Sequence, residues 1–162
     1  MNPSRETSVG FKLKRLVLTV SAAESVTGGL IGSRLTDVAG SSDYYLGGVV
    51  AYSNDAKVKL LGVKQETLAA HGAVSEPTAR EMAEGVRRSF GTDIGLAVTG
   101  IAGPGGATRD KPVGLMWLAI SAKDYSEARS IRLSGDRLQN KAGTAEEALR
   151  LLDDYLDTLI PN

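Results

Sequence analysis

Ser25 lies where an apolar run gives way to a helical one, and this setting suits a nucleophilic side chain. The surrounding residues 24–29 read Glu-Ser-Val-Thr-Gly-Gly. Backbone amides at the start of a helix are free to bind negative charge, and the helix dipole strengthens the effect. A serine hydroxyl there can attack a carbonyl group while nearby amides stabilise the oxyanion that forms. The alternative is structural, because Ser25 or Thr27 would also serve as a helix cap.

A serine nucleophile needs a base, and the sequence offers two candidates. Lys57 lies one turn into a predicted helix that follows Tyr52, and a lysine whose pKa is lowered by burial can accept the serine proton. His71 is the only histidine of the chain, but it stands at a predicted helix end, where the dipole explains its presence without catalysis. A solvated Lys57 with no catalytic role is the structural alternative. The residues by themselves leave this choice open.

A glycine-rich segment from Thr99 to Gly106 follows a predicted strand and reads Thr-Gly-Ile-Ala-Gly-Pro-Gly-Gly. Consecutive backbone amides in such a loop can form a nest that binds an anion. The segment matches neither the Walker loop nor the dinucleotide fingerprint Gly-x-Gly-x-x-Gly. We therefore predict a ligand-binding loop, with a flexible surface turn as the alternative. The acidic residues of the chain are dispersed without the spacing of metal ligands, so no metal site is predicted.

The order of secondary-structure elements predicts how these segments are positioned. Apolar runs predict strands at residues 16–20, 45–52, 94–99, 113–121 and 130–133. Helices are predicted at residues 30–35, 54–61, 76–90 and, beginning at a Thr144 cap, 144–159. This alternation indicates an α/β fold, a three-layer α/β/α sandwich around a mixed, mostly parallel sheet. The last two strands are too close in sequence for a helical crossover and should pair antiparallel.

Composition narrows the class of protein. The 162 residues fit one domain, which we place at residues 15–162 behind a flexible, polar N-terminal arm of residues 1–14. Lysine plus arginine equals aspartate plus glutamate at 19 each, and no basic cluster points to nucleic acid. The absence of cysteine excludes disulfides, thiolate zinc sites and a cysteine nucleophile. With neither a signal-peptide core nor a membrane-spanning run in the sequence, we expect a soluble, cytoplasmic protein.

Taken together and in this order, the blocks at residues 21–29, 40–57, 71–76, 98–106 and 111–114 resemble the CinA C-terminal domain. The resemblance covers about residues 17 to 137. Several long blocks in the same order are highly specific, unlike any one block alone. The resemblance implies an α/β/α fold and nicotinamide-nucleotide amidohydrolase activity (PncC). That activity converts nicotinamide mononucleotide and water to nicotinate mononucleotide and ammonia, with no metal or organic cofactor.

The resemblance also implies roles for residues of this chain. Ser25 corresponds to the nucleophile, and Tyr52 and Lys57 to the family's catalytic tyrosine and lysine. The residues implied in substrate binding are Glu24, Val26, Thr27, Gly28, Gly29, Thr99, Gly100, Ala102, Gly103, Pro104, Gly105, Gly106 and Arg137. The expected partner is the small-molecule substrate, without nucleic acid or membrane, and the family suggests a homo-oligomer, a dimer or higher.

These implications combine with the chemistry of the residues into a mechanism. Lys57, helped by Tyr52, takes the proton of Ser25 as the hydroxyl attacks the carboxamide carbon. Amides around Val26 and Thr27, joined by Thr99, hold the oxyanion. Ammonia leaves from an acyl-enzyme that water then hydrolyses. The division of base work between Lys57 and Tyr52 is not fixed by sequence.

The chain departs from the family pattern at three places. Val26 replaces the usual cysteine, Lys141 replaces an expected arginine, and the helix ahead of the first strand looks short or absent. A lysine at 141 keeps the charge but loses the bidentate fork of arginine. With no fused N-terminal domain in the sequence, the expectation is a standalone form.

Two rival functions remain open. One is a non-catalytic protein that binds nucleotides or a partner, linked to competence and DNA damage, which would keep the glycine loop without needing Ser25. The other is an amidase that acts on a different amide.

Overall fold

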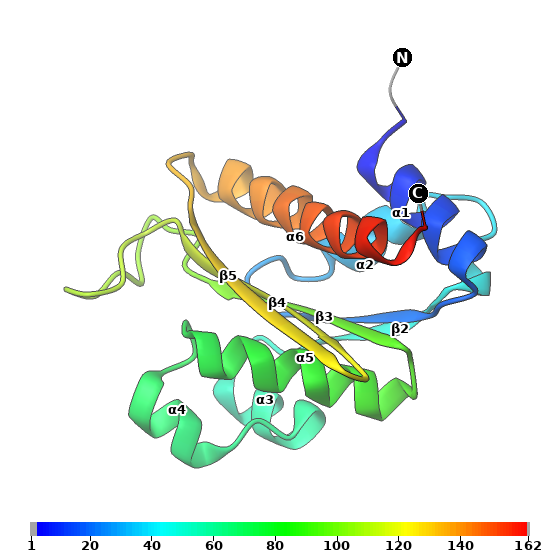
Figure 1. Ribbon diagram of the computed structural model, residues 1–162. Helices are drawn as coiled ribbons and strands as arrows, with labels where there is room; N and C mark the ends of the chain where they lie inside the picture. The colour runs from blue at the N-terminus through cyan, green and yellow to red at the C-terminus, as the bar shows by residue number, and fades with distance from the viewer. Residues whose placement is uncertain (1–2, 162) are drawn as a thin grey trace.

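The computed structural model describes residues 3–161, in which a five-stranded sheet lies between two layers of helices (Figure 1). The strands are β1 (Val20–Glu24), β2 (Tyr45–Val50), β3 (Ile94–Gly100), β4 (Leu115–Ala122) and β5 (Tyr125–Arg132). Across the sheet they follow the order β2-β1-β3-β4-β5. β2, β1 and β3 pair in parallel, whereas β4 pairs antiparallel with both β3 and β5. The predicted mixed sheet and its antiparallel final pair are confirmed.

The helices cover both faces of this sheet. They are α1 (Arg5–Leu16), α2 (Leu30–Thr36), α3 (Asn54–Leu61), α4 (Gln65–His71), α5 (Glu76–Phe90) and α6 (Arg137–Leu159), with a short 3-10 turn at Ser41–Asp43. Figure 1 shows α1, α2 and α6 on one face and α3, α4 and α5 on the other. The predicted three-layer sandwich is therefore confirmed. No helix among residues 3–161 is long and apolar enough to span a bilayer.

The core consists of two apolar layers, one on each face of the sheet. Leu96 of β3 packs into the layer under α1, α2 and α6, and its neighbour Ala97 packs into the layer under α3 and α5. Successive side chains of a strand point to opposite faces, so a central strand covered on both faces must be apolar throughout. This explains the continuous apolar run from Ile94 to Val98 in β3.

Local capping signals predicted two helices correctly and one incorrectly. The Ser53 hydroxyl accepts a hydrogen bond from the Ala56 amide at 3.0 Å to start α3, and Ser75 caps α5 in the same way. The prediction that Thr144 starts the last helix is wrong. That helix begins seven residues earlier, at Arg137, where Asp136 and Gln139 form a capping box. The Thr-x-x-Glu pattern at 144 resembles a cap, but the Thr144 hydroxyl bonds a carbonyl oxygen within the helix.

The N-terminal region differs from its prediction. Residues 1–2 of the predicted arm lie outside the described residues, but Arg5–Leu16 form a helix, so an arm through residue 14 is wrong and the first strand begins at Val20 rather than 16. Val9 and Leu13 are fully buried in the layer shared with α6. Their spacing of four residues places both on one helix face. The helix escaped sequence reasoning because its polar residues outnumber these two.

A buried carboxylate fastens α1 to α6. Asp153 of α6 accepts hydrogen bonds from Ser8, Arg5 and Lys12 of α1 at 2.9, 3.0 and 2.8 Å. Burial by itself would raise the pKa of Asp153, but the hydrogen bonds from Lys12, Arg5 and Ser8 outweigh it and lower the pKa. A carboxyl with a lowered pKa in the folded state adds stability above its unfolded pKa, and this stability is lost as the pH falls.

We expect Asp153→Asn to lower the free energy of unfolding at pH 7 by about 2 kcal/mol, because charge-assisted hydrogen bonds are lost. Thermal unfolding across pH measures the effect. The gap to the wild type should narrow as the pH drops below about 4, the ordinary aspartate pKa. Asp154→Asn, on the exposed side of the same helix, is the matched control and should change stability by less than about 1 kcal/mol. An equal loss in both variants would contradict the role of the buried contact.

Candidate active site

The parallel strands bring the predicted site segments to one edge of the sheet. Glu24 at the end of β1 lies beside Val50 of β2 and Val98 of β3. Ser25, Tyr52 and the glycine-rich segment therefore follow strands that end side by side. In open α/β sheets this carboxyl edge is where ligands bind. A cleft of about 260 Å³ opens there, lined by residues from all three segments.

Ser25 and Lys57 form a hydrogen-bonded pair on the floor of this cleft. The Lys57 Nζ lies 3.0 Å from the Ser25 Oγ, and the two residues are 2% and 7% exposed. Burial lowers the pKa of Lys57, and within residues 3–161 no carboxylate forms an ion pair with it. A buried amine without a counter-ion favours its neutral form, which can accept a proton from the serine hydroxyl.

The structure separates the two candidate bases. His71 ends α4, is exposed and does not line the cleft. Of the two, Lys57 is the residue that reaches Ser25.

Tyr52 lies at the rim of the cleft rather than in the Ser25–Lys57 pair. Its side chain is 64% exposed, and its hydroxyl accepts a hydrogen bond from Arg137 at 3.0 Å. Lys57 contacts Tyr52 only through the main chain, with 3.4 Å between the lysine Nζ and the Tyr52 carbonyl oxygen. The Tyr52 hydroxyl is thus hydrogen-bonded to Arg137, and it forms no hydrogen bond with the Lys57 amine.

The turn after Ser25 is built around Glu24. The Glu24 carboxylate is buried and accepts hydrogen bonds from the Thr27 hydroxyl at 2.6 Å and from the Ile31 and Gly32 amides at 2.9 and 3.0 Å. It therefore caps α2 from within the protein. The Glu24 carboxylate is used by these hydrogen bonds, and neither Glu24 nor Thr27 lines the cleft.

The remaining residues of this turn divide between cleft and surface. Val26 lines the cleft, whereas Gly28 and Gly29 do not. The Ser25 amide donates to the Val98 carbonyl at 3.2 Å. Among the described residues, the amides of Val26 and Thr27 have no recorded acceptor, and that of Val26, which lines the cleft, is available to a negatively charged oxygen.

The glycine-rich segment forms the opposite wall. The lining residues from it are Thr99, Gly100, Ile101, Ala102, Gly103, Gly105 and Gly106, while Pro104 faces outward. The Thr99 hydroxyl donates to the Ala73 carbonyl oxygen at 2.9 Å, so its hydrogen is committed and it is not an oxyanion donor. The backbone amides of Gly103, Gly105 and Gly106 have no recorded acceptor in the described part of the chain. These amides can bind an anion.

Two residues of α6 hold the glycine loop. Arg137 lines the cleft and donates to the Gly103 carbonyl oxygen at 2.7 Å. Asn140, which is fully buried, donates to the carbonyl oxygens of Ala102 and Gly135, each at 3.0 Å. Arg137 is a predicted site residue, whereas Asn140 was missed. Its position one turn after Arg137 was the only available signal.

Sequence reasoning also missed four residues of the cleft wall, namely Asn54, Ala73, Val74 and Ile101. Asn54 precedes Lys57 by three residues in α3, so helical spacing places both on one face. Ala73 and Val74 carry no polar group that would have marked them.

The charge of the cleft is one-sided. Arg137 contributes a cationic side chain, Lys57 adds a second positive charge only when its amine is protonated, and none of the described lining residues is an aspartate or glutamate. Such a cleft favours an anionic ligand. Within residues 3–161, no group of three or more histidine, aspartate or glutamate side chains is placed to hold a metal ion.

Comparisons with known proteins agree with this architecture. The sequence model of the CinA C-terminal domain matches residues 3–156. A putative competence-damage inducible protein of Desulforudis audaxviator is 51% identical over 152 residues, which are 94% of this chain and 37% of that protein. The chain thus spans just over a third of the length of this relative.

Solved structures of similar size resemble the whole fold. A CinA superfamily protein from Klebsiella pneumoniae superposes with a TM-score of 0.92 at 34% identity, covering 95% of this chain and 96% of that one. The competence/damage inducible protein CihA from Agrobacterium tumefaciens gives 0.88 at 40% identity, covering 97% and 98%.

Proposed function

Because the chain belongs to the family of CinA C-terminal domains, we propose that it is an amidohydrolase that deamidates nicotinamide mononucleotide, with Ser25 as nucleophile. The observation that carries this proposal is the 3.0 Å contact between the Ser25 hydroxyl and the buried amine of Lys57. A serine beside a desolvated amine is equipped for acyl transfer. The cleft around the pair, with the Arg137 guanidinium and no carboxylate in its lining, suits a substrate that carries a phosphate.

The reaction proceeds in two halves. Neutral Lys57 takes the proton of Ser25 as the serine oxygen bonds to the carboxamide carbon, and the amide of Val26 binds the oxyanion. When the tetrahedral intermediate collapses, the carbon–nitrogen bond breaks and the Lys57 ammonium protonates the departing nitrogen, which leaves as ammonia. Water, deprotonated by Lys57, then attacks the ester on Ser25. Nicotinate mononucleotide departs, and Ser25 recovers its proton.

The substrate phosphate is held by Arg137 and the glycine loop. The Arg137 guanidinium, now bonded to Tyr52 and Gly103, presents the planar fork that matches phosphate oxygens. The free amides of the loop complete the anion site. In this proposal Tyr52 orients Arg137 through its hydroxyl and contacts Lys57 through its carbonyl oxygen. The protein acts in the cytoplasm as a homo-oligomer, whose size light scattering measures.

Arg137→Ala is expected to raise KM for nicotinamide mononucleotide about 30-fold, since a charge-assisted hydrogen bond contributes about 2 kcal/mol. The value of kcat should change less, because the phosphate is remote from the reacting carbon. Steady-state kinetics with nicotinamide mononucleotide and with its nucleoside, which lacks phosphate, measure the preference that Arg137 supplies. Arg150→Ala, on the exposed side of the same helix, should leave both constants unchanged. A variant that keeps the full preference for the phosphorylated substrate contradicts the assignment.

The deciding experiment is direct. Purified protein is incubated with nicotinamide mononucleotide, and ammonia and nicotinate mononucleotide are measured together. Their appearance in equal amounts supports the proposal, and their absence from folded protein rejects it. A parallel incubation with other carboxamides tests for an amidase of different specificity.

A second candidate function is binding without catalysis. The name of one relative, the putative competence-damage inducible protein of Desulforudis audaxviator, links the family to competence and damage, and a protein in that setting could bind a nucleotide or a partner without catalysis. That function would use Arg137 and the glycine loop but not Ser25. Nucleotide binding without ammonia release, unaffected by Ser25→Ala, would favour it over the hydrolase.

A further inference from the structure

Residues 104–111 form a tongue that projects beyond the end of the sheet (Figure 1). Residues 104–110 are exposed, and Lys111 is half-buried. The base of the tongue is fixed, because Ile101 donates to the Leu115 carbonyl at 3.0 Å and Gly114 donates to the Ile101 carbonyl at 2.8 Å. Gly105 and Gly106 belong to the tongue and line the cleft. The position of the tongue therefore affects the shape of the site.

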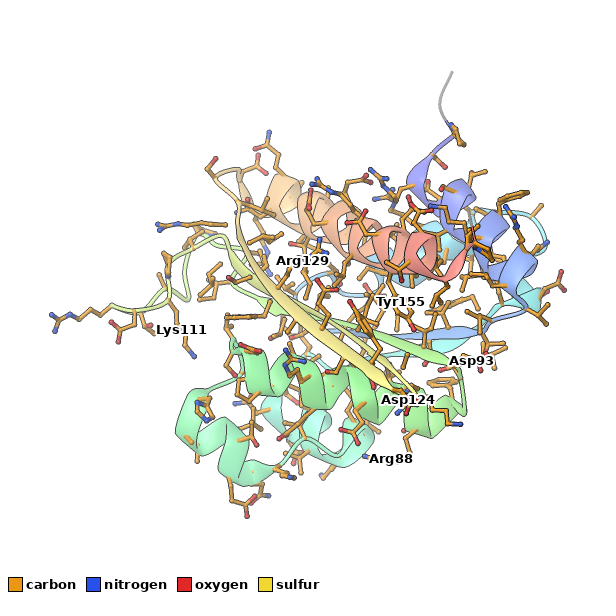
Figure 2. All side chains as sticks on the ribbon, viewed as in Figure 1. Arg88, Asp93, Lys111, Asp124, Arg129 and Tyr155 are labelled. Atoms are coloured by element: carbon orange, nitrogen blue, oxygen red, sulfur yellow. The ribbon has the colours of Figure 1, made fainter. Side chains whose placement is uncertain are left out.

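Lys111 ties the tongue to a different part of the chain. Its ammonium donates a hydrogen bond to the carbonyl oxygen of His71, the last residue of α4. In Figure 2 the labelled Lys111 lies on the tongue, on the side of α4. Carbonyl groups at a helix end carry partial negative charge, so a lysine there is favourable. A Cβ at Gly72 would lie 3.0 Å from the Lys111 Nζ, so a residue without a side chain leaves room for the ammonium.

The residues beyond this contact form a cleft wall. Ala73 and Val74 line the cleft, directly after the segment that Lys111 holds. Thr99 secures the same stretch through its hydrogen bond to the Ala73 carbonyl oxygen at 2.9 Å. The stretch 71–74 is thus attached to β3 and to the tongue, and the Gly72 carbonyl oxygen also accepts hydrogen bonds from Ser75 and Thr78 at the start of α5. The attachments to β3 and to the tongue connect it to the wall that carries the glycine loop.

We propose that Lys111 is a positioning residue that links the tongue to the end of α4 and so fixes the separation of the two cleft walls for the substrate. The inference rests on the proposed function, because the relevant consequence is substrate binding. Lys111 reaches neither Ser25 nor Lys57 through any recorded hydrogen bond. Its removal should therefore loosen the walls without disabling the reacting groups.

Amide hydrogen exchange of the whole chain tests the link independently of catalysis. In Lys111→Met, exchange of the hydrogen-bonded amides of Gly72, Thr108 and Lys111 should rise about tenfold, because the contact that holds the tongue to the end of α4 is lost. Lys111→Arg keeps the charge and the donors and should exchange like the wild type. Arg109→Met removes a positive charge from the same tongue. Among the described residues the Arg109 side chain makes no hydrogen bond or ion pair, so this variant should also match the wild type. Unchanged exchange in Lys111→Met overturns the inference.

Kinetics with nicotinamide mononucleotide test the consequence. We expect Lys111→Met to raise KM about tenfold while kcat stays within about threefold of the wild type, because ground-state binding is lost and chemistry is not. Lys111→Arg should restore KM. An unchanged KM, or an equal rise in Arg109→Met, overturns the positioning role. If the wild type releases no ammonia, the proposed function fails and the exchange contrast alone decides whether Lys111 holds the walls.

Discussion

Ser25→Ala is expected to abolish ammonia release from nicotinamide mononucleotide, with turnover lowered by about 10⁴-fold or more, as when other serine hydrolases lose their nucleophile. The reason is that the Ser25 Oγ is the atom that would bond to the carboxamide carbon, whereas the hydroxyls of Thr27 and Thr99 are already hydrogen-bonded to Glu24 and to the Ala73 carbonyl oxygen. Ammonia release under single-turnover conditions measures the loss. Binding of nicotinamide mononucleotide should persist, because the anion site lies on Arg137 and the glycine loop.

The control for this change is Ser33→Ala, an exposed serine on α2 with no recorded side-chain hydrogen bond. It should retain full turnover. Turnover by Ser25→Ala within a few-fold of the wild type would remove the covalent mechanism, even if the protein proved to be an amidase.

Lys57→Met is expected to lower kcat by at least about 100-fold, since general bases contribute roughly 10²–10⁴. Methionine fills much of the same volume without an amine. In the wild type, kcat/KM should rise with pH as Lys57 loses its proton, and the midpoint should lie below the ordinary lysine pKa because burial lowers the pKa of Lys57. The variant should lack this rise. A pH–rate profile of both proteins measures the difference, and an unchanged profile would exclude Lys57 as the base.

The same substitution should stabilise the fold at neutral pH. A folded-state pKa below the unfolded value means that the unfolded chain binds more protons between the two, so wild-type stability increases as the pH rises through that window. Below that pH window the folded protein keeps a charged amine buried, which costs free energy of desolvation, and a methionine at position 57 carries no such cost. Lys57→Met should therefore unfold at a higher temperature than the wild type at pH 7, and the gap should close toward about pH 10.4, the unfolded lysine pKa.

Lys59→Met, on the exposed side of the same helix and paired with Asp55, is the matched control. Its turnover should match the wild type, and its unfolding temperature should change only by the small amount that is usual for a surface substitution. If Lys57→Met were less stable than the wild type at pH 7, the amine would be held by contacts stronger than its burial cost.

Some features of the site follow from sequence because they obey local rules. Ser53 marks the start of α3 by capping it with its side chain, and Gly62 marks its end by adopting the left-handed region (φ 69°). Both capping signals act within one turn of the chain. The alternation of apolar runs and helices likewise predicted a sandwich in which Ser25 follows a strand and Tyr52 and Thr99 end strands. The amino-acid order therefore determined which segments could meet at the carboxyl edge of the sheet.

The choice between Lys57 and His71 as the candidate base needed the tertiary structure. Lys57 is 32 residues from Ser25 in the sequence, and only the fold shows that its amine contacts the Ser25 hydroxyl and is buried there. For the same reason Glu24 was predicted beside substrate, although its carboxylate turns inward to cap α2.

Helix α1 and the ties made by Asn140 and Lys111 also depend on partners distant in sequence, for which no local pattern exists. Sequence by itself thus determined the fold class, the family and the segments of the site. Only packing decided which polar groups are desolvated and which are already bonded, because desolvation and hydrogen-bond pairing arise from the folded surroundings and not from neighbours along the chain.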